Sequence, residues 1–274
     1  MSPYPGAPFR VGVIGAGTMG RGIAGAFLDA AADVVLVDIN PDAAASGVAR
    51  VVEAQRAHAG AGSIESGVGI DSLSGCMLVV EAVPEDPTLK AGVLVHAEAV
   101  VDHDAIVVTN TSSLSIDGLG AHLARPERFA GMHFFNPVSR SSLIEIVRGS
   151  RTAATVLARL RETAASLGKQ AIEVDDSPGF ATSRLGLAIG LEAIRMLESE
   201  VASAEDIDRA MVLGYRFPIG PLRLTDLVGL DVRLDIARHL EAELGERFAP
   251  PALLVAKVAA GEVGRKAGRG FFAW

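Results

Sequence analysis

Two ionisable side chains stand inside apolar runs of this sequence and are candidates for acid–base chemistry. His133 lies in GMHFF (131–135) and Glu145 in LIEIV (143–147), runs that are typical of buried strands. A carboxylate that holds one ring nitrogen of a histidine fixes its tautomer and favours the protonated form, which suits a general base that removes an alcohol proton. Segment 136–142 is rich in turn residues, so we expect the chain to fold back and the two side chains to meet. A purely structural histidine is the alternative interpretation.

Hydroxyl groups follow another apolar run, AIVVTN (105–110). The sequence continues as TSSLSI (111–116), so we expect Asn110 and Ser112 at the carboxyl end of a strand. Open α/β sheets bind their ligands at that edge. This segment therefore joins the candidate site.

A glycine-rich turn supplies the third candidate. VGVIGAGTMGRGIA (11–24) contains Gly15-x-Gly17-x-x-Gly20 directly after a strand-like run and at the start of a helix-like one. Gly15 allows the tight turn, Gly17 lets a pyrophosphate approach the backbone, and Gly20 permits close packing of helix on strand. Thr18 and Met19 lie in the same turn. We expect these five residues to bind a dinucleotide whose phosphates meet the helix N-terminus.

Asp38 ends the second strand-like run, DVVLVD (33–38), close to the roughly 20-residue spacing expected for the carboxylate that binds an adenosine ribose. A carboxylate repels a 2′-phosphate, and Ile39 and Asn40 offer no cation to bind one, so the sequence favours NAD over NADP. The alternative is that Asp38 only caps the helix that begins near Pro41.

The elements that would position these residues form a parallel α/β pattern up to about residue 176. Further strand-like runs lie at 77–83, 105–110, 128–135, 143–147 and 171–174. Helical patterns follow at 180–200, 204–213, 221–245 and 250–261, and 59–69 is expected to be a loop. We predict a Rossmann-type doubly wound sheet with NAD over residues 1–177 and an all-helical C-terminal domain over 178–274.

Composition narrows the class of protein. The chain has 274 residues, 49% of them apolar, with 25 Lys plus Arg against 33 Asp plus Glu. A net charge of -8 with no basic cluster argues against nucleic acid as a partner. The sequence shows no secretory leader and no apolar run of the roughly 20 residues that a membrane helix needs, so we expect a cytoplasmic protein. Cys76 is the only cysteine, which excludes a multi-cysteine metal site, and no metal is predicted.

Taken together, the motifs resemble those of the 3-hydroxyacyl-CoA dehydrogenase family along nearly the whole chain. The matching segments are GAGTMGRGIA, VVEAV, NTSSLSI, GMHFFNPV, LIEIV, SPGF, EDIDRAM, GPLRLTDLVGLD and GRKAGRGFF. The resemblance implies oxidation of a secondary alcohol, with His133 as general base, Glu145 as its orienting partner and Ser112 as the hydroxyl that binds the substrate oxygen; Ser112 as a helix N-cap is the alternative. The residues that the resemblance places around the cofactor are Glu85, Lys90, Asn110, Ser112, Asn136 and Lys266.

Two departures from the family pattern concern the substrate. Ser183 stands where the family usually has a substrate-facing asparagine, and we include it with the catalytic residues. The lysine-rich hairpin that binds CoA in the family is short here. The positions that match the serine and the lysine through which the family's hairpin contacts CoA are Ala54 and Ala61 in this sequence. A CoA thioester is therefore the family default and an acyl-carrier-protein thioester is an alternative. A free hydroxy acid is another, and it would need a cation such as Arg140 or Arg184.

Two further expectations complete the sequence analysis. The C-terminal helices are apolar on broad faces, as in LGLAIGLEAI (185–194), and the resemblance assigns such faces to a homodimer interface. A non-catalytic NAD-binding protein is the alternative from another functional class. The residues that weigh against it are His133, Glu145 and Ser112, all present in their expected context.

Overall fold

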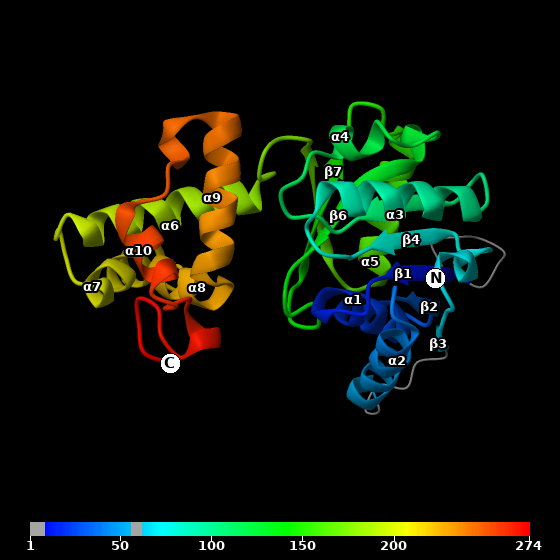
Figure 1. The fold of residues 1–274 in the computed structure, drawn as a ribbon, viewed down its shortest axis with the longest axis horizontal. Coiled ribbons are helices and arrows are strands. Elements are labelled where there is room, and N and C mark those ends of the chain that lie inside the picture. The colour runs from blue at the N-terminus through cyan, green and yellow to red at the C-terminus, as the bar shows by residue number, and fades with distance from the viewer. Residues whose placement is uncertain (1–8, 56–61) are drawn as a thin grey trace. The chain divides into compact units, whose positions relative to one another are not determined.

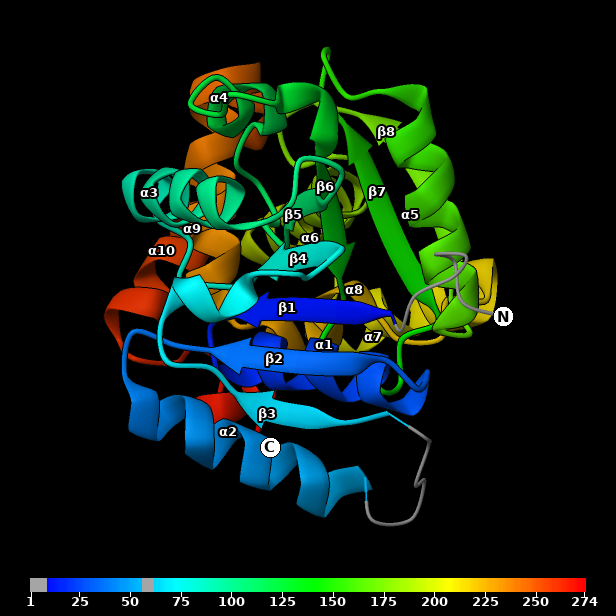
Figure 2. The same ribbon diagram turned by 90° about the vertical axis from the view of Figure 1, so that its right-hand side faces the viewer.

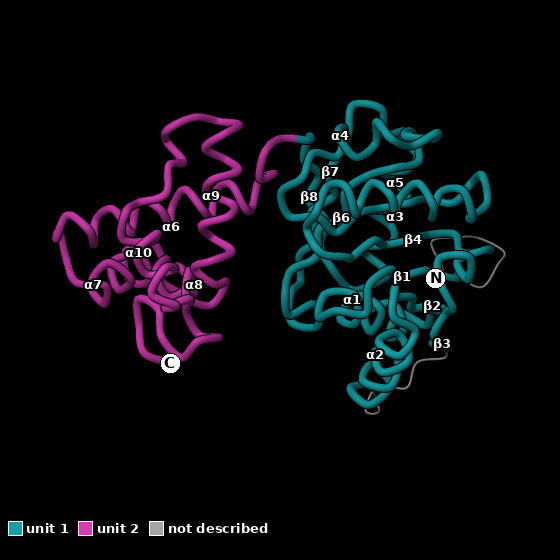
Figure 3. The backbone as a smooth tube through the Cα atoms, in the orientation of Figure 1, with its two compact units in different colours: residues 1–176 teal, residues 177–274 magenta. Residues whose placement is uncertain are grey.

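The structure, a computed structural model, describes residues 9–55 and 62–274. The chain divides into two compact units, residues 1–176 and residues 177–274, and each is described by itself (Figure 3). None of the described helices is long and apolar enough to cross a membrane.

The first unit is built on one eight-stranded sheet in the order β3-β2-β1-β4-β5-β6-β7-β8 (Figure 1). Its strands are β1 (Arg10–Ile14), β2 (Asp33–Val37), β3 (Ile64–Ser66), β4 (Leu78–Glu81), β5 (Ile106–Thr109), β6 (Phe129–Phe134), β7 (Leu143–Arg148) and β8 (Gln170–Asp175). Every neighbouring pair is parallel except β6 with β7. The predicted Rossmann-type sheet is confirmed.

Helices cover both faces of this sheet (Figure 2). They are α1 (Thr18–Asp29), α2 (Pro41–Gln55), α3 (Pro87–Val100), α4 (Ile116–Gly120) and α5 (Ala154–Ser166), with 3₁₀ turns η1 (Ile70–Leu73) and η2 (Pro126–Arg128). Residues of α1, α2 and α5 share one apolar core with alternate residues of the strands, including Val11 and Val13. Helix α3 packs on β4 and β5, and α4 on β6.

Strand β3 corrects the prediction that 59–69 is a loop. Ile64–Ser66 pairs parallel with β2, with Val34 opposite Ile64, at the edge of the sheet. The strand has only three residues and two of them are exposed, so it lacks the apolar alternation that would reveal it in the sequence. The preceding part of the predicted loop, residues 59–61, lies outside the described residues.

The second unit is helical, as predicted. Its helices are α6 (Thr182–Glu198), α7 (Ala204–Arg209), α8 (Pro221–Val228), α9 (Leu230–Leu244) and α10 (Ala252–Ala259), with a π-helical turn η3 (Ala210–Gly214) and 3₁₀ turns η4 (Glu246–Phe248) and η5 (Arg265–Ala267). Leu187, Leu191, Leu222, Leu234 and Leu240 are among the residues of its core.

The predicted single helix over 221–245 is wrong, because the chain breaks at Gly229. This residue has φ 106°, which helices do not use and which residues with a Cβ rarely adopt. Helix α8 therefore ends at Val228 and α9 starts anew at Leu230.

A buried carboxylate fastens the end of the chain to helix α8. Asp226 is 1% exposed, and its oxygens accept hydrogen bonds from Phe271 N (2.8 Å), Phe272 N (2.9 Å) and Trp274 Nε1 (2.8 Å). The guanidinium of Arg223 lies over the Phe272 ring, 4.1 Å from its centroid. One side chain thus accepts hydrogen bonds from three N–H groups of the last four residues.

Substitution Asp226→Ala should destabilise the second unit. Three N–H donors would lose their acceptor, which we expect to lower the free energy of unfolding by about 3 kcal/mol. Trp274 is the only tryptophan, so its fluorescence should shift to longer wavelength as the indole is released to water. Denaturant unfolding checks this, with the exposed Asp235→Ala as the matched control; unchanged stability and emission would contradict the role of Asp226.

Candidate active site

The antiparallel pairing of β6 and β7 brings the two buried ionisable side chains together. His133 stands directly opposite Glu145 in the register. The imidazole Nδ1 lies 3.0 Å from Glu145 Oε2, and the two residues are 7% and 0% exposed. The Phe135 ring lies against the imidazole, with 4.4 Å between ring centroids. The predicted contact between histidine and glutamate is confirmed, and it is made through Nδ1 of the ring.

Glu85 organises the loop that follows β5. Its Oε1 accepts hydrogen bonds from Thr111 Oγ1 (2.5 Å) and Ser112 N (2.9 Å), and the Ser112 hydroxyl lies at 3.4 Å. Burial raises the pKa of Glu85, but the Lys90 ammonium and these hydrogen bonds outweigh it, so the net pKa lies below its usual value. Glu85 is therefore an anion at neutral pH and fixes Ser112 at the carboxyl edge of the sheet.

Ser112 does not cap the next helix, which was the alternative reading of this residue. Helix α4 is capped by Ser115, whose side-chain oxygen accepts a hydrogen bond from Gly118 N at 3.0 Å. The Ser115 hydroxyl also donates to Asp176 Oδ2 at 2.7 Å. The two serines are three positions apart in a serine-rich segment, so residue type alone does not show which of them caps the helix.

A buried ion pair that sequence reasoning missed lies beneath this loop. Glu81, at the end of β4, is 0% exposed and Lys90 is 1% exposed. Lys90 Nζ lies 2.8 Å and 3.1 Å from the two Glu81 oxygens and 3.3 Å from Glu85 Oε2. Thr109 Oγ1 and Val83 N also donate to Glu81. Lys90, predicted to lie around the cofactor, thus has its ammonium engaged by two carboxylates of the protein.

The glycine turn has the geometry that the motif predicts. Gly15 has φ 102°, and its N–H donates to Val37 O at 2.8 Å. A Cβ on Gly20 would lie 1.7 Å from Gly15 O, so helix α1 could not approach the turn with any larger residue there. A Cβ on Gly17 would meet no atom within 4 Å. The turn therefore needs Gly20 for its own packing, whereas the space over Gly17 is open to a ligand.

A cavity of about 930 Å³ lies beside this turn. Most of its lining is apolar, and it includes Asp38 but no Lys or Arg. Asp38 Oδ2 accepts a hydrogen bond from Ala16 N (2.8 Å) and Oδ1 from Asn40 N (3.1 Å). The residues that line this cavity are Ile14, Gly15, Gly17, Thr18, Met19, Val37, Asp38, Ile39, Pro41, Val68, Gly69, Ile70, Ala82, Val83, Pro84, Leu89 and Val93. An apolar slot with one carboxylate fits an adenosine that carries no 2′-phosphate.

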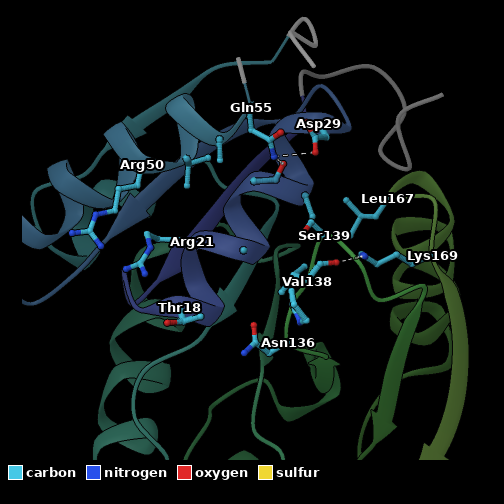
Figure 4. Close-up of a pocket in the computed structure, with 16 residues that line it drawn as sticks. Thr18, Arg21, Asp29, Arg50, Gln55, Asn136, Val138, Ser139, Leu167 and Lys169 are labelled. Atoms are coloured by element: carbon cyan, nitrogen blue, oxygen red, sulfur yellow. Dashed lines mark hydrogen bonds between the residues drawn. The ribbon is translucent and has the colours of Figure 1, made fainter. Parts of the chain in front are cut away.

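A second cavity of about 390 Å³ lies on the other side of α1 and is lined by Thr18, Asn136 and Ala54, among others (Figure 4). Figure 4 shows Arg21 and Arg50 on one side of it and Lys169 on the other. Lys169 Nζ donates to Val138 O (2.7 Å) and Ser141 O (2.6 Å), and burial lowers the pKa of this ammonium. Ala61, the other position compared with the family's CoA contacts, lies outside the described residues.

The remaining predicted residues fall into two groups. Within the first unit, Asn110 Oδ1 accepts a hydrogen bond from Phe134 N (2.9 Å), which ties β5 to the strand of His133. Ser183, in the first turn of α6, and Lys266, in η5, belong to the second unit. Lys266 Nζ lies 2.5 Å from Asp231 Oδ2.

Comparison with known proteins gives matches along almost the entire chain. Residues 10–177 match the family model described as 3-hydroxyacyl-CoA dehydrogenase, NAD binding domain, and residues 179–274 match its C-terminal domain. A 3-hydroxybutyryl-CoA dehydrogenase of Mycobacterium tuberculosis is 39% identical, over 97% of this chain and 98% of that protein. One from Bradyrhizobium diazoefficiens is 40% identical, over 96% and 94%.

Solved structures agree with these matches. The crystal structure of the (S)-3-hydroxybutyryl-CoA dehydrogenase PaaH1 from Ralstonia eutropha has a TM-score of 0.91 at 39% identity, and the match covers 98% of this chain and 99% of that one. The structure of FadB2 from Mycobacterium tuberculosis also has a TM-score of 0.91, at 38% identity, over 98% and 100% of the two chains.

Two glycine substitutions should separate cofactor binding from folding. Gly17→Ala places a methyl group in open space, so the thermal midpoint should stay unchanged while NAD binding weakens by about tenfold or more, because the pyrophosphate can no longer approach the backbone. Gly20→Ala creates a clash with Gly15 O and should lower the thermal midpoint itself. Thermal unfolding and NADH fluorescence titration check the pair. Equal effects of both substitutions on stability would contradict the assignment.

Proposed function

The chain belongs to the 3-hydroxyacyl-CoA dehydrogenase family, and from this membership we propose that it interconverts a 3-hydroxyacyl thioester and the corresponding 3-oxoacyl thioester. The family matches identify it as an NAD-dependent oxidoreductase. The observation that carries the proposal is the buried hydrogen bond between His133 and Glu145, at the carboxyl edge of a sheet whose glycine turn is built for a dinucleotide.

In the proposed reaction His133 is the general base. Its Nδ1 is held by Glu145, so Nε2 receives the hydroxyl proton as the alcohol is oxidised and returns it when the ketone is reduced. Glu145 keeps the ring in one tautomer and stabilises the imidazolium that forms. NAD supplies the acceptor for the hydride that leaves the same carbon.

We propose that two serine hydroxyls, those of Ser112 and Ser183, also contact the substrate. Glu85 binds the Ser112 backbone N–H at 2.9 Å and lies 3.4 Å from the Ser112 hydroxyl, and we propose that this hydroxyl turns toward the substrate oxygen and stabilises the charge that develops there. Ser183, on α6, replaces an amide with a shorter side chain, and we propose that it faces the substrate's acyl part.

Asp38 and its cavity support the choice of cofactor. We propose that the carboxylate accepts hydrogen bonds from the adenosine ribose and repels the 2′-phosphate of NADP. Gly15, Gly17, Thr18 and Met19 line the same cavity and would hold the pyrophosphate and the adenosine. Asn136 and Lys266 are retained as proposed cofactor-side residues. A cytoplasmic location and a homodimer formed through the second unit also remain predictions.

The group that carries the acyl chain is CoA or an acyl carrier protein. CoA is the substrate named for the relatives, but α2 carries no lysine and its Ala54 lines the second cavity. Arg21 and Arg50 are the cations that this cavity offers from α1 and α2. An acyl-carrier-protein thioester is the second candidate, because its tethered phosphopantetheine has no nucleotide to grip.

NADH oxidation with acetoacetyl-CoA tests the function directly. We expect turnover with NADH and at least about tenfold less with NADPH, because Asp38 opposes the extra phosphate. The same acyl group on a carrier protein and on a bare pantetheine thioester identifies the handle. No turnover with any of the three thioesters would contradict the proposed function and would favour a free hydroxy acid as the substrate.

His133→Ala should abolish most of the turnover while NAD binding survives, since the imidazole moves the proton but does not hold the cofactor. We expect kcat to fall by about 10²–10⁴-fold, and Glu145→Gln, which keeps a hydrogen-bond acceptor without the charge, to cause a smaller loss. The exposed His103→Ala is the matched control. Turnover that persists in His133→Ala would contradict its role as general base, whereas NAD binding without any turnover in the wild-type protein would support a non-catalytic NAD-binding protein.

A further inference from the structure

The buried ion pair of Glu81 and Lys90 leaves neither charge available to a ligand. The Lys90 ammonium lies within hydrogen-bond distance of Glu81 Oε1 (2.8 Å), Glu81 Oε2 (3.1 Å) and Val83 O (3.2 Å), and it lies 3.3 Å from Glu85 Oε2. An ammonium has three N–H donors, so these oxygens occupy all of them. Both side chains are buried, and neither is among the described residues that line the cavity beside the glycine turn. A direct contact with NAD would therefore require the pair to separate.

The pair fixes one wall of that cavity. Residues 82–84 line the cavity, and the backbone of Val83 is bound on both sides of its Cα. Its N–H donates to Glu81 Oε1 at 2.7 Å, and its carbonyl oxygen accepts from Lys90 Nζ at 3.2 Å. This wall lies against the glycine turn, since a Cβ on Gly15 would lie 2.7 Å from the carbonyl oxygen of the first wall residue. The two buried side chains thus hold the backbone that faces the turn.

The same pair is connected to the loop after β5. Glu81 Oε2 accepts a hydrogen bond from Thr109 Oγ1 at 2.5 Å, at the end of β5. Lys90 also contacts Glu85, whose other oxygen accepts a hydrogen bond from Ser112 N at 2.9 Å. Buried hydrogen bonds that share partners in this way strengthen one another. One ion pair therefore connects the cavity wall with the segment that carries Ser112.

We propose that Glu81 and Lys90 are positioning residues for NAD: they do not contact the cofactor, and they hold residues 82–84 in the conformation that cofactor binding needs. Through Glu85 the pair also positions Ser112, and this second part rests on the proposed function, from which the role of Ser112 is taken. The affinity for NADH then depends on the hydrogen bonds that the pair makes to Val83, and not only on the stability that the pair gives to the fold.

Three variants separate positioning from stability. Glu81→Gln and Lys90→Met each remove one of two paired buried charges, so each should lower the thermal midpoint and weaken NADH binding. The double variant removes both charges at similar volume, so its thermal midpoint should return close to that of the wild type. Its NADH affinity, titrated by fluorescence, should remain about tenfold or more below the wild-type affinity. The reason is that Val83 O has lost its donor, and a small displacement of a binding wall is costly.

The matched control is the exposed ion pair of Arg161 and Glu173 in the same unit. Glu173→Gln/Arg161→Met makes the same chemical changes and should leave the thermal midpoint and the NADH affinity unchanged. If the double variant of Glu81 and Lys90 recovers NADH affinity together with its thermal midpoint, the pair only stabilises the fold and the proposal is overturned. Wild-type affinity in either single variant overturns it as well. Should the double variant not fold, the affinities of the single variants, measured below their thermal midpoints, still decide the question.

Turnover tests the connection to Ser112. With acetoacetyl-CoA and saturating NADH, we expect kcat of the double variant to fall by about tenfold, because Glu85 has lost its cation and no longer fixes the loop. Wild-type kcat under these conditions would overturn this part of the proposal. No turnover of acetoacetyl-CoA by the wild-type enzyme would contradict the proposed function, whereas the NADH titrations would still decide the role of the pair in cofactor binding.

Discussion

The reversal of strand direction between β6 and β7 is the constraint on which the chemistry of the first unit depends. Every other neighbouring pair in the sheet is parallel, but the short segment 135–142 allows only an antiparallel return. That return sets Glu145 opposite His133, where the imidazole is the partner that a fully buried carboxylate requires. A slip of one residue would turn Glu145 to the other face of the sheet, so the register and the hydrogen bond stabilise each other.

The carboxyl edge of the parallel strands carries several acids, and each has donors that hold it in place. Glu81 is neutralised by Lys90 and Glu85 is bound by the loop after β5. Asp38 accepts a hydrogen bond from Ala16 N inside the glycine turn, so the carboxylate that faces the adenosine cavity also tightens the turn beside it. Because these donors are fixed, the acidic side chains can stay ionised at this edge without being driven apart by electrostatic repulsion. The same network holds Ser112 and β6 at set positions before any ligand arrives.

Much of the first unit could be predicted because its signals are local. The central strands of the sheet are continuous apolar runs, the glycine spacing fixes the turn, and the contact of His133 with Glu145 follows from one short loop. Other features depend on partners far along the chain. The segment VVEAV does not indicate that Glu81 pairs with Lys90. Residue type also does not indicate which serine of TSSLSI caps α4, and in the structure it is Ser115. Strand β3 forms because it pairs with β2, and the helix breaks at Gly229 because this residue has a positive φ. The residue types allow both features but do not require them.

The residues that keep the family pattern and those that depart from it serve different physical tasks. Proton transfer demands fixed geometry, and His133, Glu145 and the loop of Ser112 are held by buried or short hydrogen bonds within one sheet. Recognition of a remote group demands less, since an open space and a charge suffice. Ala54 and Ser183, which depart from the family pattern, lie on helices α2 and α6 outside that sheet. We therefore expect substitutions on the helices outside the sheet to alter the choice of substrate more readily than the proposed proton transfer, which depends on hydrogen bonds within the sheet.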